Sequence, residues 1–358
     1  MKKTSLVLPS MLAVAALGLS ACGAAPEESA SGEGSDFKAC IVSDAGGWDD
    51  QSFNQSTYDG LQAAIEAHGI EHAEAQSQSD SDFGPNVDAM VQQGCNLTIG
   101  AGFLLEDALQ TAAEANPDLH FGLVDSAFSD AEGAPVELEN GKPLLFNTAE
   151  ASYLAGYLAA GMTETGTVAT FGGIQIPSVA IFMDGFADGV AKYNEDKGAD
   201  VKLLGWDKEA QSGSFSGDFE NQGQGKTLTE QFIAQGADII MPVAGPVGLG
   251  AAAAASEHDG TKIIWVDSDG YNTTEYGSLI LTSVLKEIAT AVETTVTESV
   301  EGNWSAEPYV GTLENGGVGL SEYHDFAGEV PEELNSEIEA LKQQIIDGDI
   351  TIDTPNAP

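Results

Sequence analysis

Short apolar runs alternate with helix-period segments along almost the whole chain, and this alternation limits the fold more than any other feature. The runs have the length of buried strands, and the segments between them repeat apolar residues at helical spacing. Strands that alternate with helices of this size form parallel sheets. Because the runs fall into two successive series, we predict an α/β chain with two doubly wound parallel-sheet lobes.

The expected lobe boundaries lie near residues 148, 269 and 304. Residues 38–148 and about 270–304 then form an N-terminal lobe, and residues 149–269 and about 305–358 form a C-terminal lobe. Residues 282–300 are expected to be one long helix. No segment is rich enough in proline or glycine to separate two independent domains, so we expect several crossovers that act together as a hinge.

The N-terminal segment carries a targeting signal rather than part of the fold. Lys2 and Lys3 precede an apolar stretch, residues 6–19, that is too short to span a membrane. The sequence Leu19-Ser20-Ala21-Cys22 is similar to the lipobox of bacterial lipoproteins, which implies a signal peptide over 1–21 and a lipid on Cys22. Residues 22–37 would tether the protein to the outer face of the cytoplasmic membrane. The alternative is an ordinary secretory signal with an incidental cysteine.

The chain is strongly acidic, with 12 lysines, no arginine and 57 aspartate and glutamate residues, for a formal net charge of −45. This charge excludes nucleic acid as a partner, because nucleic-acid binding depends on neutralising phosphates. The guanidinium group that usually holds phosphate in a bidentate manner is missing as well. An acidic surface of this kind is typical of a highly soluble protein.

Two cysteines remain in the predicted fold, Cys40 at the first strand and Cys95 just before the third. These two strands are neighbours in sheets of the flavodoxin-like order, and thiols outside the cytoplasm tend to pair. A disulfide is therefore the first interpretation. Two small buried apolar side chains are the alternative.

One loop, residues 43–55, has the composition of a ligand site at the end of the first strand. It offers the carboxylate of Asp44, the ring of Phe53 and the amide of Asn54. It has neither of the glycine patterns that cradle phosphate. Ligands of open α/β sheets bind at this end of the strands. The alternative is a plain βα turn whose Asp and Ser residues only cap a helix.

Polar or aromatic residues, some of them beside glycines, recur at the ends of other predicted strands: Asp125, Phe171-Gly172-Gly173, Ala244-Gly245, Asp267 and Asp269. Carboxylates and aromatic rings suit a ligand that is neutral, planar and hydroxylated. For residues 267–269 a simple strand-end turn is the alternative. The chain has no HExxH, GxSxG or EF-hand pattern, so we predict neither an enzyme nor a metal or cofactor site.

Eight motifs make the chain resemble the Bmp family of substrate-binding lipoproteins over residues 38–348. They occupy residues 44–55, 94–103, 153–160, 172–186, 235–240, 243–245, 266–269 and 282–286. The resemblance implies a periplasmic-binding-protein type I fold. It also implies a monomer that works with the permease and ATPase subunits of an ABC importer.

The resemblance further implies where a purine nucleoside of the inosine, guanosine or adenosine class would bind. It places the base between Phe53 and Phe182, with Asp125 and Asp44 at the edge of the base. It places the ribose near Gly245, Lys286 and one or both of Asp267 and Asp269. The chain departs from its relatives at Met183 and Asp184, where a basic residue is common, and at Gly270, where glutamine is usual.

Two classes of function stay open at this point. The first is a receptor that delivers nucleosides to a membrane permease. The second is a lipid-anchored sensor or surface protein that binds another nucleoside-like or flavin ligand without transport. An extracellular hydrolase is disfavoured, because the sequence offers no set of acid, base and nucleophile.

Overall fold

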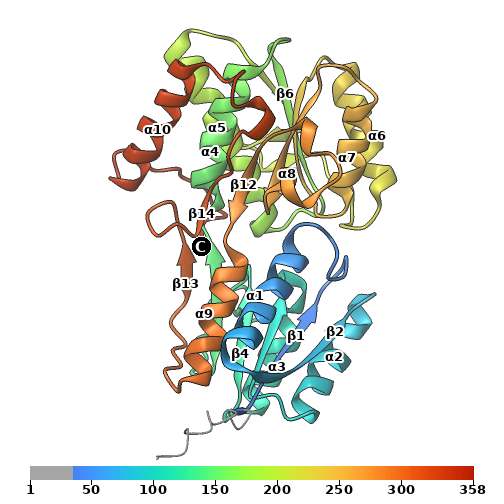
Figure 1. The fold of residues 1–358 in the computed structure, drawn as a ribbon, viewed down its shortest axis with the longest axis vertical. Helices are drawn as coiled ribbons and strands as arrows, with labels where there is room; N and C mark the ends of the chain where they lie inside the picture. The colour runs from blue at the N-terminus through green and yellow to red at the C-terminus, as the bar shows by residue number, and fades with distance from the viewer. Residues whose placement is uncertain (1–34) are drawn as a thin grey trace, which may run out of the picture. The chain divides into compact units, whose positions relative to one another are not determined.

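The structure, a computed structural model, describes residues 35–358. The expected signal peptide, Cys22 and nearly all of the tether lie outside this range. The described chain forms two six-stranded sheets and one small two-stranded sheet, and helices cover the large sheets (Figure 1). The predicted α/β class with two doubly wound lobes is confirmed. The first strand begins at Ser35, slightly earlier than the expected end of the tether.

The first sheet builds the N-terminal lobe, and its strands are all parallel in the order β13-β5-β4-β3-β1-β2. The strands are β1 (Ser35–Ser43), β2 (Ile70–Gln76), β3 (Leu97–Ala101), β4 (His120–Val124), β5 (Gly141–Phe146) and β13 (Tyr309–Gly311). The helices are α1 (Phe53–His68), α2 (Asp80–Gln92), α3 (Glu106–Ala115) and α9 (Ile288–Val300), with the 3₁₀ turn η1 (Phe103–Leu105) before α3. Helices α1 and α9 pack on one face of the sheet, and α2 and α3 pack on the other.

The second sheet builds the C-terminal lobe in the order β14-β12-β11-β10-β6-β7, with β14 antiparallel to its neighbour. Its strands are β6 (Thr167–Gly172), β7 (Lys202–Leu204), β10 (Ile239–Val243), β11 (Lys262–Asp267), β12 (Ile280–Lys286) and β14 (Val318–Leu320); β8 (Trp206–Asp207) and β9 (Ser212–Gly213) form a separate hairpin. The helical elements are α4 (Thr148–Met162), α5 (Pro177–Lys197), α6 (Gln222–Ala234), α7 (Val247–Ser256), α8 (Gly270–Thr273), η2 (Gly277–Leu279), η3 (His324–Phe326) and α10 (Glu332–Ile346). Helices α4 and α5 pack against each other, as do α6 and α7.

Helix α4 is buried on almost all sides, because α5, α10 and the second sheet surround it. Glycines let α4 and α5 approach closely: a Cβ at Gly156 would meet the carbonyl of Phe186, and one at Gly189 would meet the carbonyl of Tyr153. None of the helices between residues 35 and 358 combines the length and apolar character needed to cross a membrane.

Two segments lie in a different lobe from the one expected. Residues 280–286 form β12 of the second sheet, although residues 270–304 were assigned to the N-terminal lobe and 282–300 to a single helix. Conversely, β13 pairs with β5 in the first sheet. Strand β12 is almost wholly buried, and its apolar residues, at 280, 281, 284 and 285, follow helical spacing instead of the alternation of a half-buried strand. The described chain therefore crosses between the lobes at residues 147, 287 and 312–317.

Cys40 and Cys95 form a disulfide in the structure, with their Cα atoms 6.0 Å apart. Cys40 lies on β1 opposite Thr98 of β3, and Cys95 lies just before β3. The expectation that these strands are neighbours is confirmed. The disulfide belongs to the core cluster beneath α2 and α3, where it joins two adjacent strands of the N-terminal lobe.

Candidate ligand-binding site

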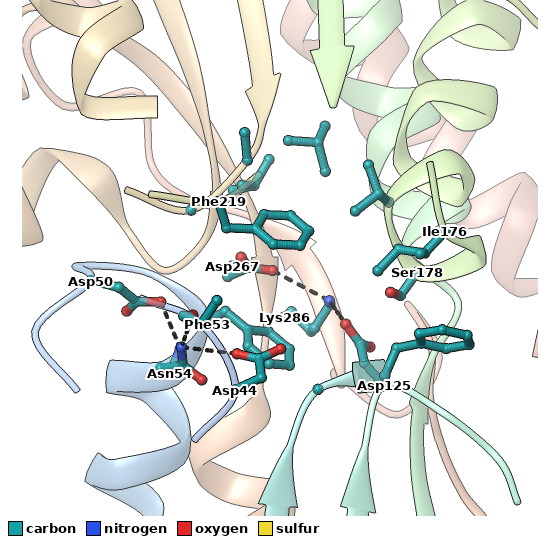
Figure 2. Close-up of a pocket in the computed structure, with 18 of the residues that line it drawn as sticks. Asp44, Asp50, Phe53, Asn54, Asp125, Ile176, Ser178, Phe219, Asp267 and Lys286 are labelled. Atoms are coloured by element: carbon teal, nitrogen blue, oxygen red, sulfur yellow. Dashed lines mark hydrogen bonds and ion pairs between the residues drawn. The ribbon is translucent and has the colours of Figure 1, made fainter. Parts of the chain in front are cut away.

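A cavity lies where the carboxyl ends of strands from both sheets come together (Figure 2). From the N-terminal lobe it is lined chiefly by Asp44, Asp50, Phe53, Asn54, Phe103 and Asp125. From the C-terminal lobe it is lined chiefly by Ile176, Ser178, Phe182, Phe219, Gly245, Asp267 and Lys286. The structure therefore brings together every ligand contact expected from the sequence except Asp269.

The loop before α1 is held in shape by the buried carboxylate of Asp50. It accepts backbone N–H groups of Ser52 at 3.0 Å, Asn54 at 2.8 Å and Gln55 at 3.0 Å. These N–H groups belong to the first turn of α1, which has no intrahelical acceptors for them. Burial raises the pKa of Asp50 to about 6, although the three hydrogen bonds oppose this shift. The alternative role predicted for this loop, in which aspartates only cap the helix, therefore applies to Asp50. Asp44 and Asn54 instead lie with their polar atoms at the cavity.

Asp44 and Asn54 form a corner of the cavity that is rich in acceptor atoms. The amide of Asn54 donates to Oδ1 of Asp44 at 3.2 Å and to the carbonyl of Ala45 at 2.9 Å. Oδ1 of Asn54 is buried and has no partner among the described residues. Burial raises the pKa of Asp44 well above its usual value, and the carboxylates of Asp50 and Asp125 act in the same direction. A ligand that supplies hydrogen-bond donors would satisfy this corner.

Lys286, at the end of β12, places its ammonium group between aspartates from the two lobes (Figure 2). Nζ lies 2.5 Å from Oδ2 of Asp125 and 3.3 Å from Oδ1 of Asp267. The side chain of Lys286 is only 2% exposed, and each aspartate side chain is 9% exposed. Burial alone would lower the pKa of Lys286, but the two carboxylates outweigh burial and raise it. The ammonium therefore stays charged and links the lobes.

Asp125 and Asp267 occupy equivalent positions in the two lobes. Each is the Asp of a Val-Asp-Ser sequence, residues 124–126 and 266–268, at the end of a buried strand. Each also has a left-handed backbone, with φ of 67° at Asp125 and 68° at Asp267. Residues other than glycine rarely adopt this conformation, which concentrates at functional sites. The matching geometry indicates that both turns are built to aim a carboxylate at the cavity.

Aromatic rings supply the apolar part of the site. Nζ of Lys286 lies 5.1 Å from the ring centre of Phe53 and 4.9 Å from that of Phe182, within the range of cation–π attraction. Figure 2 shows Phe219 above Lys286, where it comes from the irregular segment before α6. Sequence reasoning missed Phe219, which lies in no motif. It also missed Phe103, Ile176 and Ser178, which lie within the motifs at 94–103 and 172–186 but were not expected to contact a ligand.

Asp269 lies outside the cavity lining. Its carboxylate accepts the backbone N–H of Tyr271 at 3.2 Å and so caps α8. It also pairs with Nε2 of His324 at 2.8 Å. The sequence left open which of Asp267 and Asp269 lies at the ligand site, and in the structure Asp267 is the one that lines the cavity. Asp269 instead has the alternative role, that of a residue in the turn after the strand.

The unusual residues after Phe182 point away from the site. Asp184 is fully buried in the C-terminal lobe and accepts from Nε1 of Trp206 at 2.9 Å and from Thr354 at 2.5 Å. Met183 is fully buried too and is absent from the cavity lining. The departure from the family pattern at these positions therefore changes the interior of the lobe rather than the wall of the cavity.

The site as a whole combines four buried carboxyl groups, one paired ammonium, an acceptor amide and several aromatic rings. In the described part of the chain, no three His, Cys, Asp or Glu side chains are arranged to hold a metal ion. Such a site favours a flat ligand with several N–H and O–H donors. It disfavours a phosphate, which would lie among carboxylates without an arginine to hold it.

Two doubly wound lobes with a polar, aromatic-lined cavity at their strand ends are an architecture found in bilobal solute-binding proteins. The family model described as "ABC transporter substrate-binding protein PnrA-like", Bmp, matches residues 37–354. The chain belongs to this family. It is therefore a substrate-binding protein of ABC transporters and not an enzyme.

Similar proteins agree with this assignment. The chain is 30% identical to the ABC transporter nucleoside-binding protein BmpA of Lactococcus lactis, over 98% of this chain and 99% of that protein. It is 29% identical to a CD4+ T-cell-stimulating antigen of Listeria innocua, over 98% of each chain. A solved solute-binding protein of an ABC transporter system from Aeropyrum pernix is 27% identical, with a TM-score of 0.77, over 89% of this chain and 94% of that one.

Proposed function

We propose that the chain binds purine nucleosides between its lobes and delivers them to a membrane permease. One observation carries the proposal: a buried acceptor set of Asp44, Asn54 and Asp125 shares a cavity with Phe53 and Phe182. A purine base has the flat face and the edge N–H donors that suit this set. The name of the Lactococcus lactis relative, a nucleoside-binding protein, supports the same ligand class.

In the proposed complex the base lies between Phe53 and Phe182, and Asp125 and Asp44 accept its edge N–H groups. The ribose hydroxyls meet Asp267, Lys286 and the backbone at Gly245. Because the ribose contacts come largely from the C-terminal lobe and the base contacts from both lobes, a whole nucleoside joins the lobes better than a free base does. Closure of the lobes over the ligand would then mark the loaded state for the permease.

Calorimetry with inosine, guanosine, adenosine, uridine, hypoxanthine and inosine monophosphate tests this proposal. Purine nucleosides should bind most tightly, hypoxanthine more weakly and the nucleotide weakest. Phe53→Ala should lower the affinity about tenfold, since an aromatic contact contributes on the order of 1 kcal/mol beyond its buried area. Tyr193→Ala is the matched control, because Tyr193 packs on Tyr157 instead of lining the cavity. Equal affinity for nucleoside and nucleotide, or no loss in Phe53→Ala, would refute the proposed site.

We also propose that Cys22 carries a lipid that holds the protein at the outer face of the membrane. The motif at residues 19–22 and the apolar stretch before it support this proposal. Cys22→Ser should leave the precursor uncleaved and without acyl chains, which mass spectrometry of the membrane fraction can measure. Recovery of an acylated Cys22→Ser protein would contradict the proposal.

A further inference from the structure

The loop before α1 reaches across from the N-terminal lobe to the end of β11 in the C-terminal lobe. The backbone carbonyl of Gln51 accepts three hydrogen bonds there: from Oγ of Ser268 at 2.8 Å, from Nε1 of Trp265 at 3.3 Å and from Oγ1 of Thr273 at 3.3 Å. Three donors from the C-terminal lobe thus converge on one carbonyl of the N-terminal lobe, which makes a specific contact between the lobes. We call residues 50–52 and these donors the interlobe clasp.

The backbone of the clasp is shaped to make this reach. Gln51 has φ of 59°, a left-handed conformation that is unfavourable for a residue with a side chain. Such a conformation persists only where the surroundings hold it, and it points to a functional role. Asp50 provides that hold, because its carboxylate binds the three N–H groups that follow it in the turn.

Capping by Asp50 also frees the side chain of Ser52. Ser52 is the N-cap residue of α1, yet its hydroxyl makes no capping bond. Instead Oγ lies 2.8 Å from Oδ2 of Asp267 and 3.2 Å from the carbonyl of Val266, both in the C-terminal lobe. Lys286 approaches the other oxygen, Oδ1, of the same carboxylate. The carboxylate of Asp267 is thus oriented by a hydroxyl from one lobe and an ammonium from the other.

We propose that Ser52 is a positioning residue that aims Asp267 at the ligand, and that the interlobe clasp couples ligand binding to lobe closure. Ser52 is fully buried and lies outside the cavity lining, so it acts on the ligand through Asp267. When the lobes separate, Asp267 loses the hydroxyl of Ser52 and the carbonyl of Gln51 loses its donors. The clasp also favours closed lobes when no ligand is bound. The ligand part of this proposal rests on the proposed function.

Stopped-flow kinetics with guanosine test the positioning role. Ser52→Ala should raise the dissociation rate about tenfold, because the closed complex loses the hydroxyl that orients Asp267. Ser56→Ala is the matched control: its hydroxyl lies one turn further along α1 and bonds the carbonyl of Ser52 within the same helix. In an Asp267→Ala background, Ser52→Ala should have little further effect on the affinity. Equal dissociation rates for the Ser52 and Ser56 variants, or additive losses with Asp267→Ala, would overturn the positioning role.

Small-angle X-ray scattering tests the clasp without any ligand. The double variant Ser52→Ala/Ser268→Ala should have a larger radius of gyration than the wild type, and an unchanged radius would overturn the clasp. This measurement separates two failures. If wild-type protein binds no nucleoside, the proposed function fails, but the scattering result still decides whether the clasp holds the lobes together.

Discussion

Lys286→Met should lower the free energy of unfolding by about 3–5 kcal/mol and weaken nucleoside binding on the order of 100-fold. The expected loss is large because the ammonium lies within 2.5 Å of Asp125 and 3.3 Å of Asp267, both nearly buried. Without it, two carboxyl groups from different lobes face each other in a space of low polarity. Methionine keeps an unbranched apolar stem as far as Cε, so the change removes chiefly the ammonium group. Urea unfolding and calorimetry measure the two effects.

Lys262→Met is the matched control for this prediction. Lys262 is also buried, at the start of β11, but its ammonium lies 5.7 Å from the ring centre of Phe326 rather than between carboxylates. We expect this variant to bind nucleosides like the wild type and to lose much less stability. Equal stability of the Lys286→Met and Lys262→Met variants would show that the buried ion pair between the lobes contributes little to the free energy of unfolding.

The free energy of unfolding should be larger near pH 5 than at pH 7.5. This trend is opposite to that of a protein in which folding lowers the pKa values of its carboxyl groups. Burial raises the pKa of Asp50 from 3.8 to about 6, so the folded state holds a proton that the unfolded chain releases. The stabilisation is present at low pH and is lost as the pH rises through about 6. One such shift corresponds to at most about 3 kcal/mol. Burial of Asp44 acts in the same direction, because it raises that pKa as well.

Urea unfolding at pH 5, 6 and 7.5 measures this dependence. Asp50→Asn should make this dependence weaker, since the variant no longer binds a proton at this position, and the part due to Asp44 should remain. Asp88→Asn, an exposed aspartate on α2, should keep the wild-type slope. The prediction fails if stability falls toward pH 5, or if Asp50→Asn shows the same slope as the wild type.

Much of the fold could be predicted because most strands and helices carry clear local signals. Helix α1, for example, ends at His68, and the next residue, Gly69, has a left-handed backbone that only glycine adopts easily. The exception was β12, where neither glycine nor proline separates the strand from α9. The apolar residues of β12 lie at positions 280, 281, 284 and 285, with Thr282 and Ser283 between them, and this spacing is typical of a helix. The boundary expected near residue 269 was wrong for the same reason.

Residues of the candidate site could be predicted where a motif marks the end of a strand. They could not be predicted where contacts between distant segments determine which side chain lines the cavity. Asp267 and Asp269 lie in one turn, and only their tertiary contacts show that Asp267 lines the cavity while Asp269 pairs with His324. Phe219 lies in an irregular segment with no motif. The three donors to Gln51 bind a backbone carbonyl, which any residue type could provide, so the sequence carries no direct sign of the interlobe clasp.

The central claim is that a purine nucleoside occupies the cavity between the lobes. Mass spectrometry of the small molecules released from protein purified without refolding tests it most directly. We expect a purine nucleoside at up to one molecule per chain in the wild type, and its loss from a Phe53→Ala/Asp125→Asn variant that remains folded. Release of a phosphorylated compound or of a ligand without a purine ring, or equal retention of the nucleoside by the variant, would contradict the claim.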